Sequence, residues 1–268
     1  MPRRLRISLA ALALAAVPAL TVLAPAASSA DAAVASTATR LLPALAPSAS
    51  LGTRYSGYIV TGGATSPYLG SYITAGASWV QPTATCSAFT SAASFSVGVG
   101  NPYAMPHAPY SGPLEQAGTD TDCSGGSPVY YGWYATPDFS RVSFGGAVHA
   151  GDTMMATASC LATLCYLSLS DQTAGWSAST SQTASSMPGS AEVNISRLYR
   201  NQSLLPLTNF GTVSFSQVSF NGEPIPTSPV SQEIIYNGPG NPLDSISALG
   251  YDSSSLSNYF SGTWLAAY

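Results

Sequence analysis

Charged residues are scarce in this chain of 268 residues. They make up 7% of it, against roughly 25% in a typical soluble domain, and the eight basic residues are all arginine, with no lysine. Twelve acids give a net charge of −4. Neutralising nucleic-acid phosphates takes clustered lysine and arginine, so nucleic acid is excluded as a partner. Because so sparse a set of charges gains little repulsion as the pH falls, it indicates tolerance of an acidic medium.

Histidine and cysteine are also scarce. The two histidines, His107 and His149, are isolated and lack the close-set partners of a zinc site, so no metal or cofactor is expected. The four cysteines are Cys86, Cys123, Cys160 and Cys165. In an exported chain they indicate two disulfides, for which three pairings are possible. We favour Cys160 with Cys165, because four intervening residues fit a clip across a β-turn, and therefore Cys86 with Cys123.

Long apolar runs are absent except near the N-terminus. A basic segment (2–6), an apolar run (7–23) and small residues (24–30) predict a signal peptide over 1–30. A membrane anchor is the alternative, but the apolar run is short and is broken by proline. We expect a secreted, extracellular protein with no membrane contact once the signal is removed. Residues 31–51, rich in Ala, Ser and Pro, are interpreted as a linker or short pro-segment, followed by one domain over 52–268.

No stretch of helical length and periodicity follows the predicted signal. The pattern is instead a series of short runs that alternate apolar and polar residues, divided by Gly, Pro, Ser and Asn. These runs include 72–80, 94–99, 129–134, 141–144, 154–158, 165–170, 176–180 and 211–215. Such spacing predicts an all-β fold, an antiparallel sandwich or barrel. Residues 165–180 are predicted to form a hairpin that turns at 171–175.

The run 129–134 is aromatic on both faces. In a strand, Tyr131 and Trp133 point to one side while Tyr130 and Tyr134 point to the other. Such a strand can be buried in the core on both faces or can line a cleft with one of them. Spacing alone favours the core.

Common catalytic patterns are missing. A Ser-His-Asp triad would have to use one of two isolated histidines, and no Gly-x-Ser-x-Gly elbow precedes a helix. A cysteine nucleophile is disfavoured because all four cysteines pair plausibly, and no Asp-Thr-Gly-type motif is present. A sandwich that cleaves sugars with two scattered acids stays open as an alternative.

Eight segments in a fixed order resemble bacterial secreted members of the glutamic peptidase (eqolisin) family. They are 55–60 (YSGYIV), 78–86 (SWVQPTATC), 114–120 (LEQAGTD), 130–134 (YYGWY), 151–152 (GD), 190–192 (SAE), 207–215 (LTNFGTVSF) and 262–264 (GTW). Each motif alone is weak, whereas eight in the same order are specific. The resemblance implies an antiparallel β-sandwich of concanavalin A-like or jelly-roll type, made of two large bent sheets. It also implies an acid endopeptidase acting on protein or peptide substrates, which we expect to be a monomer.

The family's two catalytic residues match Gln116 and Glu192 in this sequence. The resemblance implies that Glu192 is the general base and acid on water, while Gln116 orients that water and stabilises the oxyanion. An ordinary glutamate titrates near ~4.3, so we expect this base to be available in moderately acidic solution. The two side chains should then meet within hydrogen-bond or one-water reach. Further residues match the surrounding cleft or its support: Asp120, Trp133, Tyr131, Ser96 and Gly118.

The chain departs from the family pattern in the predicted cleft. Ser96 stands where the family has tryptophan, Gly100 where it has aspartate, and Ala135 where it has glutamate. After Glu192, Val193–Ser196 replace a segment that carries another aromatic and another acid. We therefore interpret the cleft as diverged, with changed specificity, a higher pH optimum or weak activity. The alternative function is a weakly active or inactive sandwich that binds peptide or polysaccharide.

Overall fold

The computed structural model describes most of the chain from Ser50 onward. The described residues are 50–52, 54–61, 74–87, 89–100, 114–135, 140–162, 164–183, 189–201, 203–222 and 230–268. The predicted signal peptide (1–30) lies outside them, as does the predicted linker (31–51) except for its last two residues, which begin a strand. Over these ranges there is no helix, and hence none able to cross a membrane.

Sheet A contains eight strands in the order β1-β15-β2-β11-β4-β5-β6-β7. Their bounds are β1 (Ser50–Gly52), β15 (Val230–Ile235), β2 (Tyr55–Thr61), β11 (Ser190–Ser196), β4 (Ala92–Gly100), β5 (Leu114–Asp122), β6 (Val129–Ala135) and β7 (Arg141–Ala147). Only the β1–β15 pair is parallel. Sheet A is therefore an almost wholly antiparallel sheet in which distant segments of the chain become neighbours.

Sheet B contains eight strands, seven of them in the order β10-β9-β8-β3-β14-β18-β16, with β17 pairing with β18. Their bounds are β10 (Trp176–Thr183), β9 (Leu164–Asp171), β8 (Thr153–Leu161), β3 (Thr74–Val80), β14 (Thr212–Phe220), β18 (Ser257–Trp264), β16 (Asp244–Ile246) and β17 (Gly250–Asp252). A separate ribbon joins β12 (Tyr199–Arg200) to β13 (Ser203–Leu204). The predicted hairpin is confirmed as β9 and β10, joined by the turn after Asp171.

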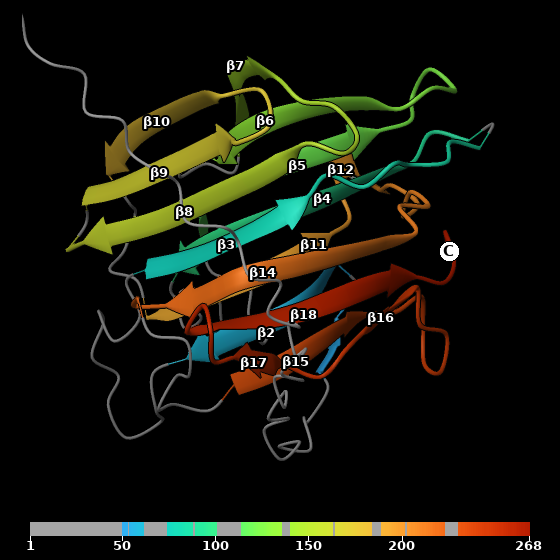
Figure 1. Cartoon of the computed structure of the whole chain (residues 1–268). Helices are drawn as coiled ribbons and strands as arrows, with labels where there is room; N and C mark the ends of the chain where they lie inside the picture. Colours follow the sequence, from blue (N-terminus) through green and yellow to red (C-terminus); the bar gives the residue numbers. More distant parts are fainter. Residues whose placement is uncertain are drawn as a thin grey trace, which may run out of the picture. The chain divides into compact units, whose positions relative to one another are not determined.

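The two sheets pack face to face through one hydrophobic core (Figure 1). Every second residue of a strand enters it, as the alternating pattern predicts. In β4 these residues include Phe95 and Val97, and sheet B contributes Phe215 and Phe260, whose rings stack with centroids 4.8 Å apart. The predicted all-β sandwich of two large antiparallel sheets is confirmed.

The aromatic strand β6 serves both of the roles considered for it. Tyr130 and Tyr134 pack against the core, as spacing favoured, and the Tyr130 hydroxyl accepts a hydrogen bond from the Ala84 backbone N–H at 3.0 Å. Trp133 is also fully buried, but strand alternation directs it to the opposite face of sheet A. That face holds the candidate site.

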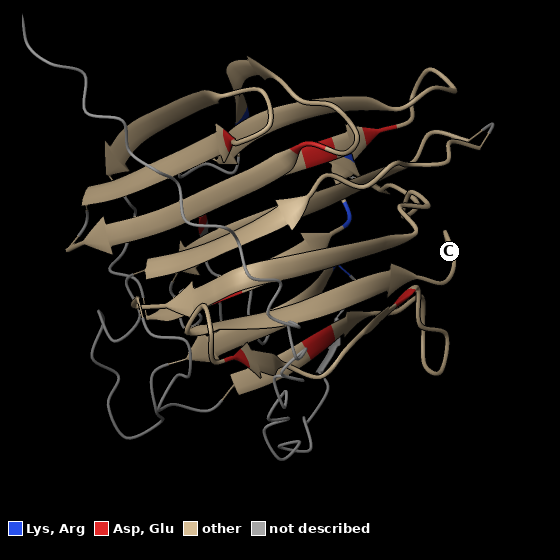
Figure 2. Ribbon diagram, in the orientation of Figure 1, with Lys and Arg blue, Asp and Glu red and all other residues tan. Residues whose placement is uncertain are grey.

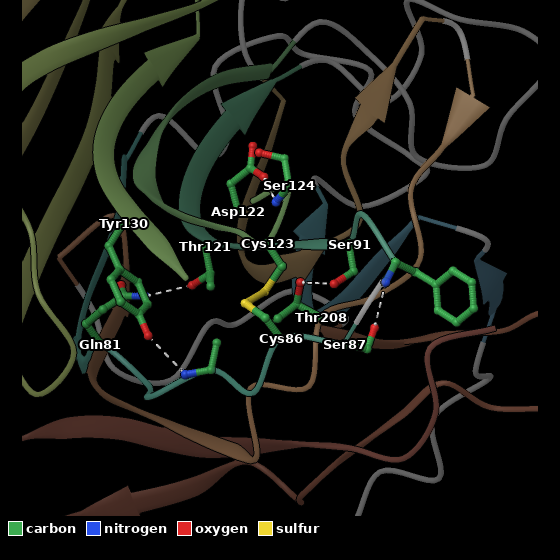
Figure 3. Close-up of a disulfide and its surroundings, with 12 residues drawn as sticks. Gln81, Cys86, Ser87, Ser91, Thr121, Asp122, Cys123, Ser124, Tyr130 and Thr208 are labelled. Atoms are coloured by element: carbon green, nitrogen blue, oxygen red, sulfur yellow. Dashed lines mark hydrogen bonds between the residues drawn. A yellow bond between two sulfur atoms is a disulfide. The ribbon is translucent and has the colours of Figure 1, made fainter. Parts of the chain in front are cut away.

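Both disulfides have the favoured pairing, Cys86 with Cys123 and Cys160 with Cys165. Figure 3 shows the first of them beneath the end of β5, where it ties the loop after β3 to Cys123. Beside it the Gln81 side chain donates to Thr121 Oγ1 at 3.0 Å. These links fix the end of β5, the strand that carries most of the acids of sheet A.

The charged residues are divided unequally between the sheets (Figure 2). The strands of sheet A carry Glu115, Asp120, Asp122, Arg141, Glu192 and Glu233. The strands of sheet B carry only Asp171, Asp244 and Asp252, each at a strand end. The ionisable groups of the sandwich are thus concentrated in the sheet that holds the site.

Candidate active site

Gln116 and Glu192 come from strands that are not adjacent. Gln116 on β5 lies opposite Gly98 on β4, and Gly98 lies opposite Glu192 on β11. Their strand neighbours Ala117 and Val193 belong to the core between the sheets. Alternation therefore directs Gln116 and Glu192 to the other face of sheet A, across the width of one strand from each other.

Gly98 leaves the space in which the two side chains meet. A Cβ atom at this position would lie 2.8 Å from Gln116 Cγ and 3.4 Å from Glu192 Oε1. Without it, Gln116 Nε2 donates a hydrogen bond to Glu192 Oε1 at 2.8 Å. Both side chains are buried. The expected meeting of Gln116 and Glu192 is thus observed, and it depends on a glycine that sequence analysis did not single out.

Asn194 is a second amide at the same carboxylate. It follows Glu192 by two residues on β11, and its Nδ2 donates to Glu192 Oε1 at 2.6 Å. Its Oδ1 accepts a hydrogen bond from Ser96 Oγ at 2.9 Å. Sequence analysis placed Ser96 in the cleft but missed Asn194, although the two-residue spacing from Glu192 was a signal that both share a face.

The predicted supporting residue Asp120 lies farther along the same face. Arg141, from the edge strand β7, donates to both oxygens of its carboxylate. The same guanidinium lies over the ring of Trp133, 3.7 Å from its centroid, in a cation–π contact. Asp120 and Trp133 are fully buried, and 19% of the Arg141 side chain is exposed. Sequence analysis missed this role of Arg141, because nothing in the sequence shows which acid it contacts.

Gly118 and Tyr131 complete the set of predicted cleft residues. The backbone of Gly118 lies so close to β4 that no side chain would fit. A Cβ atom at this position would come within 2.2 Å of the Phe95 carbonyl oxygen and 2.7 Å of Ser96 Cβ. Tyr131 is half-buried beside Asp120. Burial, and then the negative charge of Asp120, raise the pKa of the Tyr131 hydroxyl. All seven predicted residues therefore share one face of sheet A, but Asp120 and Tyr131 lie beyond Gly118 from the Gln116–Glu192 pair.

Residues 55–249 match the family model of the Peptidase A4 family. The chain belongs to the Peptidase A4 family. The predicted enzyme class, a glutamic-type endopeptidase, is thereby confirmed as that of the family. Among curated proteins, no sequence matches this chain.

Solved structures of glutamic peptidases have the same fold as this A4 family member. Scytalido-glutamic peptidase, solved with a transition-state analogue inhibitor, aligns with a TM-score of 0.61 and 19% identity over 81% of this chain and 100% of that one. SCP-B, a member of the eqolisin family solved with the tripeptide Ala-Ile-His, aligns with a TM-score of 0.59 and 18% identity over the same shares. Because the sequence identity is so low, these likenesses establish the fold alone.

Burial dominates the electrostatics of Glu192 in this A4 site. It raises the pKa of Glu192 to about 8, and repulsion from Glu233 on β15 adds to the rise. Hydrogen bonds from Gln116 and Asn194 and the positive charge of Arg54 oppose it. The expectation that Glu192 titrates near its ordinary value is therefore wrong. That expectation could not include the desolvation of a side chain covered on a folded sheet.

The described residues contain no group of three or more His, Cys, Asp or Glu that could hold a metal ion. The groups that meet at Glu192 are one buried carboxyl, two amides and a hydroxyl. A carboxyl can exchange a proton, and an amide can donate hydrogen bonds at any pH without titrating.

Proposed function

We propose that the chain is a secreted endopeptidase that hydrolyses peptide bonds with Glu192 and Gln116. The observation that carries the proposal is the 2.8 Å hydrogen bond between Gln116 Nε2 and Glu192 Oε1 across Gly98, inside a fold of the Peptidase A4 family. A carboxyl and an amide buried together on a sheet face do little for packing. They are suited to moving a proton and holding an oxyanion.

Glu192 is proposed as the group that takes and returns the proton. In the described part of the chain both amides donate to Oε1 and no group donates to Oε2. Oε2 is thus the oxygen that accepts a proton from water as the water oxygen bonds to the scissile carbonyl carbon. The carbonyl electron pair moves to its oxygen. When the C–N bond breaks, Glu192 returns that proton to the leaving nitrogen.

Gln116 is proposed as the hydrogen-bond donor to the oxyanion. Its amide nitrogen carries two hydrogens, of which one is donated to Glu192 Oε1, so the other can reach the substrate oxygen. The amide also orients the attacking water. Because Glu192 fixes one N–H, the second is held in direction before the substrate arrives, which lowers the cost of reorganisation in the transition state.

The pH dependence follows from the burial of Glu192. Only the ionised carboxylate can accept the proton, and its pKa is raised to about 8. We therefore propose that the rate rises with pH through the acidic and neutral range, instead of reaching its limit just above the ordinary pKa of glutamate. The pH optimum of cleavage that we propose is therefore higher than the acidic optimum implied by the family resemblance.

The test is digestion of a reduced and alkylated protein substrate from roughly pH 3 to pH 9, with cleaved bonds identified by mass spectrometry. Glu192→Gln should abolish cleavage and Glu115→Gln should not. Glu115 is the matched control, since it is also buried and carries a carboxyl raised in pKa by burial, but it points to the core side of β5. Equal cleavage by wild type and Glu192→Gln would overturn the proposal. No cleavage by folded wild type would favour the binding function.

A further inference from the structure

A chain of hydrogen bonds extends beyond Gln116 and Glu192 on the same face of sheet A. Ser96 Oγ donates to Asn194 Oδ1 at 2.9 Å, and Asn194 Nδ2 donates to Glu192 Oε1 at 2.6 Å. Ser96 and Asn194 are opposite each other in the β4–β11 pair. All three side chains are nearly or fully buried, with 0% to 3% of each exposed. The chain is therefore shielded from competing water.

The Ser96 hydroxyl supports the direction in which the Asn194 amide faces, which the Glu192 carboxylate favours. With Oδ1 accepting from Ser96, the Nδ2 group is directed at the carboxyl of Glu192. The reversed amide would place its oxygen against a carboxylate oxygen, which is repulsive when Glu192 is ionised. Buried hydrogen bonds of this kind strengthen one another and specify a single arrangement.

We propose that Asn194, oriented by Ser96, is a positioning residue that holds Oε1 of Glu192 in place and leaves Oε2 as the oxygen that exchanges the proton. This inference rests on the proposed function and deepens it. With Gln116 and Asn194 both donating to Oε1, rotation of the carboxyl group would break two hydrogen bonds inside a buried site. The proton-carrying oxygen is thus fixed relative to the Gln116 amide.

Asn194 also favours the ionised form of Glu192. The groups that influence this carboxyl are Glu233 on β15, which repels it, Arg54 before β2, which attracts it, and the donors Gln116 and Asn194. Tyr55 on β2 lies within electrostatic reach as a neutral phenol, its own pKa raised by burial to about 12. Removing the Asn194 donor takes away one of the few contacts that oppose desolvation, so the carboxyl should titrate at higher pH.

The kinetic test uses Asn194→Leu, Ser96→Ala and the double variant. Asn194→Leu should lower kcat roughly 10-fold to 100-fold with little change in KM, and should move the ascending limb of the pH profile upward by about one pH unit. Ser96→Ala should do the same to a smaller extent. Because Ser96 acts through Asn194, the double variant should be no worse than Asn194→Leu alone.

Ser94→Ala is the matched control. It removes the same hydroxyl two residues earlier on β4 and on the same face, where Ser94 contacts the Thr119 carbonyl and Arg141 instead of Asn194. It should leave the pH profile unchanged. Additive losses in the double variant, or the same pH profile in Asn194→Leu as in wild type, would overturn the inference. Ser96→Ala keeps the test valid if Asn194→Leu fails to fold.

A measurement without substrate separates this inference from the proposed function. The chain has four glutamates, so ¹³C-labelled glutamate gives few carboxyl signals, and Glu192→Gln identifies the one from Glu192. Its titration midpoint should rise in Asn194→Leu and in Ser96→Ala but not in Ser94→Ala. An unmoved midpoint overturns the positioning role even if the enzyme cleaves. A raised midpoint supports it even if wild type shows no cleavage and the proposed function fails.

Discussion

Two buried acids on the same face of sheet A have opposite surroundings. Asp120 is in direct contact with a guanidinium, that of Arg141, which is itself held over Trp133. Glu192 is contacted by two neutral amides, and the carboxylate of Glu233 repels it. Both acids lie on strands of one sheet and are shielded from water. The difference between them therefore comes from the groups that they contact and not from their burial.

The difference indicates what each acid is suited for. A buried carboxylate paired with arginine links two strands as part of the framework. A buried carboxyl that has only amide donors can gain or lose a proton near neutral pH, which is what a group that transfers protons requires. The same sheet therefore provides a structural ion pair and a titrating carboxyl.

Among substitutions that leave Glu192 and Gln116 themselves unchanged, the largest expected effect is that of Gly98→Ala. The added Cβ would lie 2.8 Å from Gln116 Cγ, so Gln116 must move away from Glu192. We expect cleavage to fall roughly 100-fold or more while the disulfides and fold stay intact. Gly76→Ala in β3 of sheet B is the control, since its Cβ would meet Ser219 Oγ at 3.2 Å, far from the site. Full activity of Gly98→Ala would contradict the geometry described.

Asp120→Asn should mainly affect stability. It leaves Arg141 without its anionic partner, and the free energy of unfolding should fall by about 3 kcal/mol, measured by urea denaturation. Adding Arg141→Met to the same protein should recover much of the loss, because no uncompensated charge remains. If Asp120→Asn were as stable as wild type but inactive, Asp120 would have a role in catalysis, as proposed for Glu192. The contrast between a structural acid and a proton-transferring acid would then be wrong.

Asp244 tests whether burial among neutral partners alone produces a titrating acid. It accepts hydrogen bonds from Ser56 Oγ and the Ile235 N–H, and burial raises its pKa from 3.8 to about 6. The folded protein therefore holds this proton more tightly than the unfolded chain. The stabilisation that the Asp244 proton provides is complete below about pH 4 and is lost as the pH rises through 6.

The predicted size of that loss is roughly 2 to 3 kcal/mol between pH 4 and pH 7. Urea denaturation at several pH values should show a loss that is smaller by this amount in Asp244→Asn, which keeps the loss due to the raised pKa of Glu192, while cleavage is the same in both. Identical pH dependence in the two proteins would show that Asp244 does not carry a raised pKa.

The smallest expected effect is that of Glu233→Gln. It removes the charge that repels Glu192, so the pKa of Glu192 falls and the ascending limb of the pH profile moves to lower pH by a fraction of a unit. Asp122→Asn is the control, because Asp122 is paired with Arg200 near the protein surface. Equal pH profiles for wild type and Glu233→Gln would remove Glu233 from the description of the site.

The fold was largely predictable from the sequence, because period-two alternation is a local property. Strands such as 94–99 and 165–170 were located within a few residues, and the close pair Cys160 and Cys165 indicated the disulfide pairing. Gln116 and Glu192 were identified only through resemblance to a family, since each looks ordinary in its own segment.

The rest of the site depends on strand register, which the sequence does not specify. Gly98 matters because β4 lies between β5 and β11 in this register. The contact of Arg141 with Asp120 crosses from the edge strand β7 to β5, and the pKa of Glu192 depends on how completely the fold covers it. These properties arise only when distant strands are placed side by side.

The most direct test of the central claim measures cleavage and stability in the same preparations of wild type and Glu192→Gln at about pH 8. The account predicts that cleavage is lost by roughly 1,000-fold or more, whereas the free energy of unfolding is unchanged or higher, because glutamine has no buried charge to desolvate. Glu192→Gln that still cleaves peptide bonds at the wild-type rate would contradict the account.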